Sequence, residues 1–480
     1  MGGDFQFISI QVKDVAKDKA TRRQARSHAV KKALEKKRKH QQLFMNNFAI
    51  STLGDFDKLT ETAKSRTSTS MAPLLSRLSG ALDPFQTLAV DSSRLQVLLD
   101  DYRARQAPEP VFSLAEELAF QSFRSVFRTG FDDPALVNAV MLALAFAATG
   151  GSINRECLRY QSQAITYIRE RMDSVDDAAS EGTIGAILLI AGVVARLRLT
   201  PQVELHMGAV QQLLRICQRK SVYLTPGIKR AIFWQDLNSS ILAGSRRIVD
   251  HTTFAELLWM RDPFVPNSYR LPLGFQSRSH ILGEEFGAVL EDIHALQCIR
   301  DIPRTPGADA MLMLHINNHI ASVQSRLVAL SGLSQLQECC RLAAYLCSVT
   351  LCCKVWCELV IPSHLSSQLL VKLWETRDAL VWDEDPDLRL WLLYIGGAFA
   401  PIGPIRFGYL DLLRPNNATI LAKTYCSWPE LYDVMKQFIW SDKAFMAPVR
   451  ALWQEASQTR LVVEGSVRHA SKVTTSSSLL

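Results

Sequence analysis

The chain has 480 residues and a formal net charge of +7, from 54 Lys and Arg against 47 Asp and Glu. Between Lys13 and His40, twelve basic residues face three acidic ones, so this stretch carries +9 and the rest of the chain carries −2. The distribution excludes a uniformly basic protein of the ribosomal type. With 48% hydrophobic and 21% charged residues, the composition is globular and excludes disorder along the whole chain.

Residues 1–50 are predicted to form a basic, partly disordered N-terminal arm. Good helix formers run from Thr21 to Gln42, but Val30 and Leu34 are the only large apolar side chains among them. Such a helix cannot bury a face by itself, so we expect it to be marginal until it meets a partner.

Two further segments are expected to lack a core of their own. Residues 51–73 hold nine Ser or Thr together with Gly54 and Pro73, which is typical of a linker. Residues 461–480 are mostly polar and are predicted to be a disordered tail.

Residues 74–460 are predicted to be helical almost throughout, with no convincing strand. Helix starts are indicated by a capping box at Ser113–Glu116 and by prolines in the first turn at 134, 201, 226 and 429. Later helical runs are expected at 309–330, 333–360, 364–382, 387–399 and 444–458. The predicted fold class is all-α, as one large body or as two halves that meet near 269–305.

No segment reaches the roughly 20 apolar residues that a membrane span requires, so no membrane association is expected. The first residues lack the apolar region of a secretory signal.

Motifs of catalysis are missing from the sequence: it contains no P-loop, no G-x-G-x-x-G and no G-x-S-x-G. His315 and His319 are one helical turn apart, but Ile316 stands where a zinc protease has glutamate, so surface or interhelical polar roles are favoured over a metal site. The acids of Asp383–Asp387 are interrupted by Pro386, which argues against a magnesium motif on one helix face. These acids, and the pairs at 100–101, 132–133 and 176–177, are expected at helix N-termini.

Six cysteines cluster between Cys339 and Cys357 without a C-x-x-C pair. This spacing lacks the tight knuckle from which a structural zinc site usually takes two ligands, so buried apolar packing is the favoured interpretation. We therefore predict no catalytic residues, no metal and no cofactor, and a protein that is not an enzyme.

The basic arm carries the strongest functional signal. Its candidate residues for nuclear import or phosphate contact lie within eighteen positions: Arg22, Arg23, Arg26, Lys31, Lys32, Lys36, Lys37, Arg38 and Lys39. A cluster of this kind is typical of segments that nuclear import receptors bind. Contact with the DNA phosphate backbone is compatible with import, whereas a basic zipper is not supported because no leucine heptad follows.

Several segments resemble the fungal-specific transcription factor family. The matching segments are Phe5–Ile10, Arg22–His28, Gly182–Ile190 with His206–Leu214, Ile232–Asp236 with Ala243–Gly244, and Leu390–Ala398. The resemblance spans most of residues 5–450. Within it, Trp234, Trp391, Gly396 and Gly397 are expected to pack helices together rather than to act chemically.

The resemblance implies a nuclear, all-helical regulator of transcription. Typical members carry an N-terminal Zn₂Cys₆ cluster, whereas the first cysteine here is Cys157, so zinc and sequence-specific DNA reading are not carried over. We expect nuclear localisation, an import receptor as partner, and either DNA phosphates or a DNA-binding partner regulator, with homo- or heterodimerisation as an option. The alternatives are an interaction scaffold whose arm binds acidic partners and, third, an all-α enzyme.

Overall fold

The computed structural model describes seven stretches of the chain, and every secondary-structure element in them is a helix. These stretches are residues 88–105, 132–262, 268–301, 310–352, 360–377, 381–413 and 427–458. They belong to one compact unit of residues 77–480. The predicted all-α fold class is therefore confirmed for the described part of the chain. The arm 1–50, the linker 51–73 and the tail 461–480 lie outside it.

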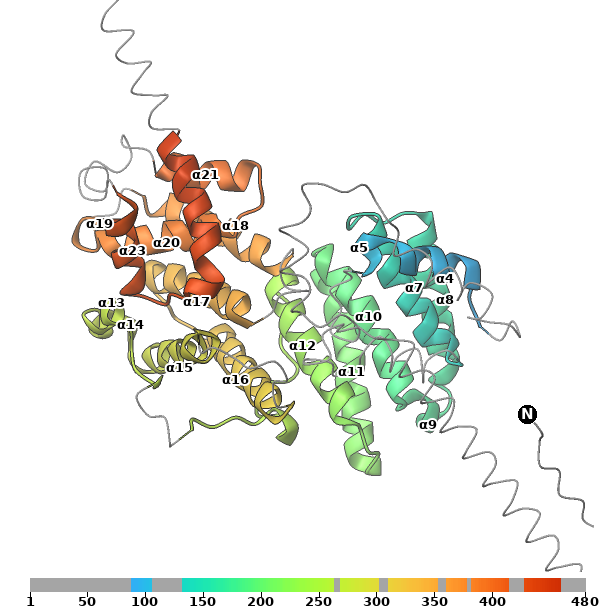
Figure 1. Ribbon diagram of the computed structural model, residues 1–480. Coiled ribbons are helices and arrows are strands. Elements are labelled where there is room, and N and C mark those ends of the chain that lie inside the picture. The colour runs from blue at the N-terminus through green and yellow to red at the C-terminus, as the bar shows by residue number, and fades with distance from the viewer. Residues whose placement is uncertain are drawn as a thin grey trace, which may run out of the picture. The chain divides into compact units, whose positions relative to one another are not determined.

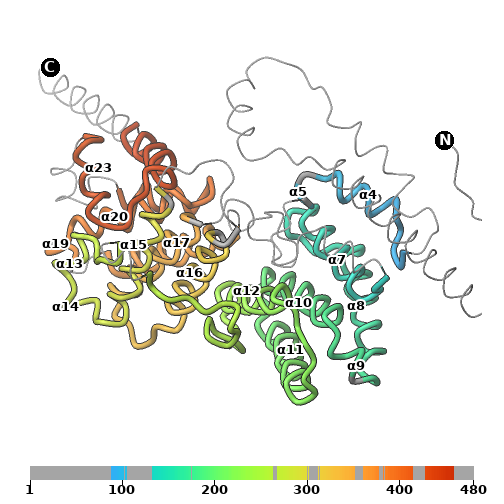
Figure 2. The backbone as a smooth tube through the Cα atoms, turned by 60° about the horizontal axis from the view of Figure 1, so that its bottom comes forward, coloured from blue at the N-terminus to red at the C-terminus, as the bar shows by residue number. Residues whose placement is uncertain are grey.

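The first group of helices is built around α10 (Glu181–Arg196), which packs against α7, α8, α11 and α12 (Figures 1 and 2). The other members are α4 (Ser92–Asp100), α5 (Tyr102–Arg105), α7 (Pro134–Ala148), α8 (Arg155–Arg171), α9 (Val175–Ala178), α11 (Thr200–Lys220) and α12 (Pro226–Ala243). Helices α7 and α10 are apolar nearly all round and almost wholly buried. Such helices belong at the centre of a large core, which explains why they lack a polar face.

The second group is built around α17 (Gln335–Cys352), which packs against α15, α16, α18 and α20. The remaining elements of this group are η2 (Ala255–Leu257), α13 (Leu273–Gln276), α14 (Ser279–Leu282), α15 (Glu284–Asp301), α16 (Ala310–Ala329), α18 (Ile361–Glu375), α19 (Val381–Glu384), α20 (Pro386–Ala398), α21 (Pro404–Leu412), α23 (Trp428–Lys436) and a last helix at 442–458. Helix α12 contacts both α16 and α18, so the two groups share a continuous core.

Helix starts follow the sequence signals closely. The Asp133 carboxylate accepts a hydrogen bond from Leu136 N at 2.9 Å, with Pro134 in the first turn of α7. Ser427 and Glu430 form a capping box at the start of α23. These side chains satisfy backbone N–H groups that have no partner within the helix, which is why polar residues followed by proline mark the boundaries.

One predicted helix is divided in the structure. The run 364–382 was expected to be continuous, but α18 ends at Glu375 and α19 begins at Val381. The indole N–H of Trp382 donates to the carbonyl oxygen of Thr376 at 2.8 Å, and Leu373 and Trp382 are both buried. The apolar pattern therefore reports burial on both sides of the break rather than an unbroken helix.

The aromatic and glycine residues expected to pack helices do so. Trp391 is fully buried and stacks against Phe438, with ring centroids 5.4 Å apart. A Cβ atom on Gly396 would lie 2.3 Å from the hydroxyl of Tyr409, so the absence of a side chain allows α20 and α21 to approach closely. Among the described helices, none combines the length and the apolarity that crossing a lipid bilayer requires.

Candidate functional site

The nine basic residues predicted to contact an import receptor or phosphate all lie in the arm, outside the described residues. Their role stays a prediction. The candidate sites that the structure does place are the histidine pair, the cysteine cluster, the acidic helix starts and a pocket that the sequence did not reveal.

The histidine pair of α16 contacts a tryptophan instead of converging on an ion. The indole N–H of Trp259 donates to Nε2 of His315 at 3.2 Å, and the Trp259 ring stacks on His319 with centroids 3.8 Å apart. Burial lowers the pKa of His319 well below its ordinary value, and the charges of His315 and Arg326 act in the same direction. A neutral, stacked imidazole holds the non-helical segment around Trp259 against α16, so the pair has a structural role.

An ion-pair hub supports the same segment. Asp292 on α15 is buried and binds the guanidinium groups of both Arg261, at 2.7 Å, and Arg326. Arg261 also pairs with Glu291 at 2.9 Å. The charge of Asp292 is therefore compensated from two elements, which a buried carboxylate requires.

The cysteine cluster is structural where it is described. Cys339, Cys340 and Cys347 are buried in α17, and burial raises the pKa of the Cys339 thiol to about 12. Thiols in this state are poor nucleophiles and poor metal ligands because the thiolate is disfavoured. No group of three metal-binding side chains occurs within the described stretches, and Cys353 and Cys357 lie outside them.

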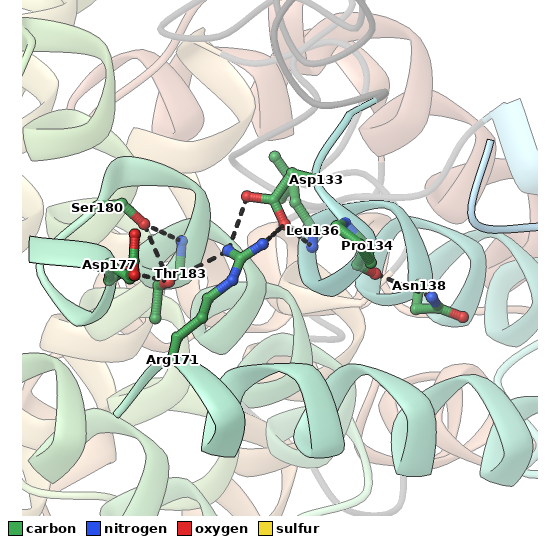
Figure 3. Close-up of polar contacts among 8 residues, drawn as sticks. All are labelled: Asp133, Pro134, Leu136, Asn138, Arg171, Asp177, Ser180 and Thr183. Carbon is green, nitrogen blue, oxygen red and sulfur yellow. Dashed lines mark hydrogen bonds and ion pairs between the residues drawn. The ribbon is translucent and has the colours of Figure 1, made fainter. Parts of the chain in front are cut away.

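The acidic pair at 132–133 belongs to a polar network that joins α7, α8, α9 and α10 (Figure 3). Besides capping α7, Asp133 accepts two hydrogen bonds from Arg171 at the end of α8, at 2.7 and 2.9 Å. Arg171 also reaches the hydroxyl of Thr183 in α10 at 3.3 Å, and that hydroxyl donates to the carbonyl oxygen of Asp177 at 2.9 Å. These contacts fit the predicted helix-start role and fix the helices relative to each other.

A pocket of about 560 Å³ opens where five elements meet: the α10–α11 turn, the C-terminal ends of α12 and α16, and one face each of α17 and α18. Its size falls within the range of small-molecule sites in proteins. Its wall is mixed, with charged and polar side chains beside aliphatic ones, among them Ile241, Leu242, Val328 and Leu330.

Two helix ends shape the pocket wall. Arg198 adopts the left-handed conformation, with φ of +58°, and its backbone N–H donates to the carbonyl oxygen of Ala195 at 2.9 Å as α10 ends. Gly244 ends α12 with φ of +66°. The left-handed region is uncommon for residues other than glycine, so the arginine is held there by its surroundings.

Of the two arginines that line the pocket, Arg341 is paired with a carboxylate and Arg198 contacts a histidine. Arg341 makes two hydrogen bonds to Glu338, at 2.6 and 2.7 Å, so these two charges neutralise each other. Nη2 of Arg198 lies 3.1 Å from Nδ1 of His364. Because a guanidinium group only donates, Nδ1 accepts and the ring proton of His364 resides on Nε2.

His364 is kept neutral by its environment. Burial and the charge of Arg198 lower its pKa, and the nearby backbone carbonyl of Ile241 acts in the opposite direction without reversing the shift. The hydroxyl groups of the wall are used internally: Thr200 donates to the carbonyl oxygen of Ala243 at 2.5 Å, and Ser240 donates to that of Leu237 at 2.8 Å. The pocket is thus equipped for binding, with one cation that lacks an anionic partner among the described residues.

Sequence reasoning missed this pocket because its residues are far apart along the chain and each lies in an ordinary helix or at a helix end. The left-handed arginine has no sequence signature, since glycine or asparagine would be expected there. Comparisons of the chain with models of protein families, with curated proteins and with solved structures yielded no match.

Proposed function

We propose that this protein is a nuclear regulator of transcription whose basic arm directs import and whose helical unit responds to a small-molecule effector. The observation that carries the proposal is the separation of charge: residues 13–40 hold +9, while the remainder of the chain holds −2. A basic arm attached to a near-neutral helical unit fits a regulator that is imported through the arm and acts through the helical unit. The resemblance of the arm and of α10, α11, α12 and α20 to the fungal-specific transcription factor family supports the same function.

The helical unit supports a regulatory role through its pocket. The pocket has a wall of polar and aliphatic side chains, a paired Glu338–Arg341 and an arginine without an anionic partner among the described residues. A bound molecule would touch helices from both groups, so its binding energy would favour conformations in which the groups stay together. DNA contact would then come from the arm, through phosphates, or from a partner regulator that reads bases.

A scaffold function is the second candidate, favoured by large apolar side chains on the surface. Ile402 is 93% exposed, Met260 is 83% exposed and Phe407 is 64% exposed. Side chains of this kind are found at protein–protein interfaces. In this alternative the arm would bind acidic partners outside the nucleus.

Nuclear import is tested with residues 1–50 fused to a fluorescent reporter. We expect nuclear accumulation that is lost when Lys36, Lys37, Arg38 and Lys39 are replaced by alanine. The matched control replaces Gln41 and Gln42, which flank the cluster but carry no charge. A reporter that stays cytoplasmic removes the main support for the regulator.

Chromatin occupancy of the full-length protein separates the two candidates. We expect enrichment at a set of promoters, and a reduced signal when residues 1–50 are deleted and a heterologous import signal is added back. A promoter signal that stays reduced although import is restored would indicate that the arm contacts DNA phosphates. Absence of enrichment at every promoter would favour the scaffold.

A further inference from the structure

We propose that residues 258–262 form a strap that is released from the helical unit in mild acid, when His315 and His319 beneath it take up protons. The strap follows η2, has no regular secondary structure and ends the described stretch 132–262. It combines a surface segment, one aromatic anchor and two titratable rings. Its release concerns the helical unit alone and does not rest on the proposed function.

The strap buries little apolar surface of its own. Leu258 is 54% exposed and Met260 is 83% exposed, so both side chains lie in solvent. Trp259, between them, is the apolar side chain that the strap places against α16. A segment with few buried apolar contacts opens at a lower cost in free energy than the core beneath it.

The indole of Trp259 rests on both histidines of α16. Its N–H donates to Nε2 of His315 at 3.2 Å, and its ring stacks on His319 with centroids 3.8 Å apart and planes 8° apart. Nε2 of His315 accepts this hydrogen bond only while it carries no proton. A proton on that nitrogen therefore removes the hydrogen bond and places a positive charge beside His319.

His319 cannot hold a proton favourably while the strap is closed. Its side chain is wholly buried, and neither ring nitrogen makes a hydrogen bond to a described residue. The backbone of Asp292 favours protonation of the ring but does not reverse the effect of burial. A closed imidazolium group would lack water, whereas release of the strap lets water reach it. Proton uptake and release of the strap are therefore coupled.

The charges beside the ring are already balanced. Arg261 of the strap and Arg326 of α16 both bind Asp292 of α15, and Arg261 also binds Glu291. Two guanidinium groups thus face two carboxylates, and an imidazolium group at His319 would add a positive charge without a partner. Such a charge next to two arginines disfavours the closed strap.

Neighbouring elements do not offset this added charge. Further titratable groups that face α16 from them are neutral, positive or already paired: Tyr269, Tyr345 of α17, Arg230 of α12 and the pair Lys229–Glu256 beside η2. The strap is therefore expected to stay closed while both histidines are neutral and to open as they become charged.

Labelling of His319 by diethyl pyrocarbonate tests the proposal, because the reagent reacts with neutral imidazole that is open to solvent. Mass spectrometry of the labelled full chain gives the rate for His319, which is divided by the rate for free N-acetylhistidine at the same pH. This quotient measures the open fraction of the strap. From about pH 7.5 to about pH 5.5 we expect it to rise about 100-fold, which is about tenfold for each histidine that becomes exposed to water.

Three variants separate the parts of the strap. His315→Gln keeps an acceptor for the indole N–H but does not titrate, so the rise should shrink to about tenfold. Arg261→Gln removes the ion pairs of the strap and should raise the open fraction by a similar factor at both pH values. Met260→Ala is the matched control, since it changes an exposed residue of the strap and should leave the open fraction unaltered.

Urea below the unfolding transition distinguishes release of the strap from unfolding of the whole unit. A local opening exposes little surface, so the quotient for His319 should stay nearly constant as urea is added. The proposal is overturned if the quotient does not rise in acid, if His315→Gln responds as the wild type does, or if the quotient increases steeply with urea. The last result would show that the ring is reached only by global unfolding.

Discussion

At the scale of single residues, Gly182 at the start of α10 shows how a missing side chain can hold a helix junction together. A Cβ atom at this position would lie 2.0 Å from Oδ2 of Asp133. The carboxylate cannot simply move aside, because Arg171 and the backbone N–H of Leu136 both bind it (Figure 3). Glycine is therefore required for a close approach rather than for a special backbone angle.

We expect Gly182→Ala to lower the free energy of unfolding by about 1–3 kcal/mol, as overpacking and the loss of a cap typically do. Urea denaturation of the full chain measures this difference. Gly208→Ala is the matched control, since Gly208 lies within α11 and an added Cβ would meet no atom within 4 Å. There alanine should be neutral or stabilising by up to about 1 kcal/mol. Equal effects at the two sites would show that Asp133 can shift without cost.

The sequence predicted that Asp133 caps a helix but could not predict that it pairs with Arg171. Its place before Pro134 marks it as a helix cap, because capping depends on neighbours in the chain. Its pairing with Arg171, 38 positions away, depends on how α7 and α8 pack. A helix cap can be predicted from the positions of neighbouring residues in the sequence. The partner of a side chain in another helix can be identified only once the packing of the helices is known.

At the scale of elements, the clamp between α4 and α8 makes part of the stability depend on pH. Arg94 binds Glu156 through two hydrogen bonds, at 2.7 and 2.8 Å. The hydrogen bonds from Arg94 lower the pKa of Glu156 below its ordinary value of 4.5. The ionised carboxylate therefore stabilises the fold fully above about pH 4.5, and this contribution is lost as the pH falls through the lowered pKa.

Glu156→Gln should lower the free energy of unfolding by about 0.5–1 kcal/mol at pH 7, a modest value because Arg94 is partly exposed to solvent. The difference from wild type should vanish in strongly acidic solution, where the protonated Glu156 is as neutral as the glutamine that replaces it. Denaturation curves at several pH values measure it. Glu204→Gln on the exposed face of α11 should show no such dependence, because Glu204 has no ion-pair partner among the described residues. A difference that persists at low pH would mean that packing, not charge, holds α4.

Helix starts were predicted better than helix ends, for a physical reason. Proline in the first turn fixes φ and needs no hydrogen-bond donor, so the starts of α7, α12 and α23 are visible in the sequence. The break between α18 and α19 was missed because Leu373 before it and Trp382 after it are both buried. Periodicity records which side chains are buried and does not report where the backbone leaves the helix.

At the scale of the whole molecule, the pocket could not have been predicted. Arg198 and His364 are 166 positions apart and meet only because α12 joins the two groups of helices. The all-α class followed from composition and periodicity, which are averages over many residues. A site made by five elements is a property of their packing, and no single stretch of the chain contains it.

The same packing buries His319 and partly shields other histidines from solvent, which should make the fold sensitive to mild acid. Burial lowers the pKa of five of them below the ordinary value of 6.5: His206, His251, His294, His319 and His364. The folded protein keeps these rings neutral, whereas the unfolded chain takes up protons near pH 6.5. Stability should therefore be complete above this pH and should fall as the pH decreases through it.

His319 allows this prediction to be tested at one site. The groups around its ring are the positive Arg261 and Arg326, His315 and the backbone of Asp292, of which only the last favours protonation. A ring that stays neutral costs about 1.4 kcal/mol per pH unit below the unfolded pKa. His319→Phe keeps a ring against Trp259, so the slope of unfolding free energy between pH 6.5 and about 5.5 should become shallower by about that amount. The exposed His280, changed to Gln, should leave the slope unaltered. An unchanged slope in His319→Phe would mean that the buried imidazole takes up its proton in the folded state.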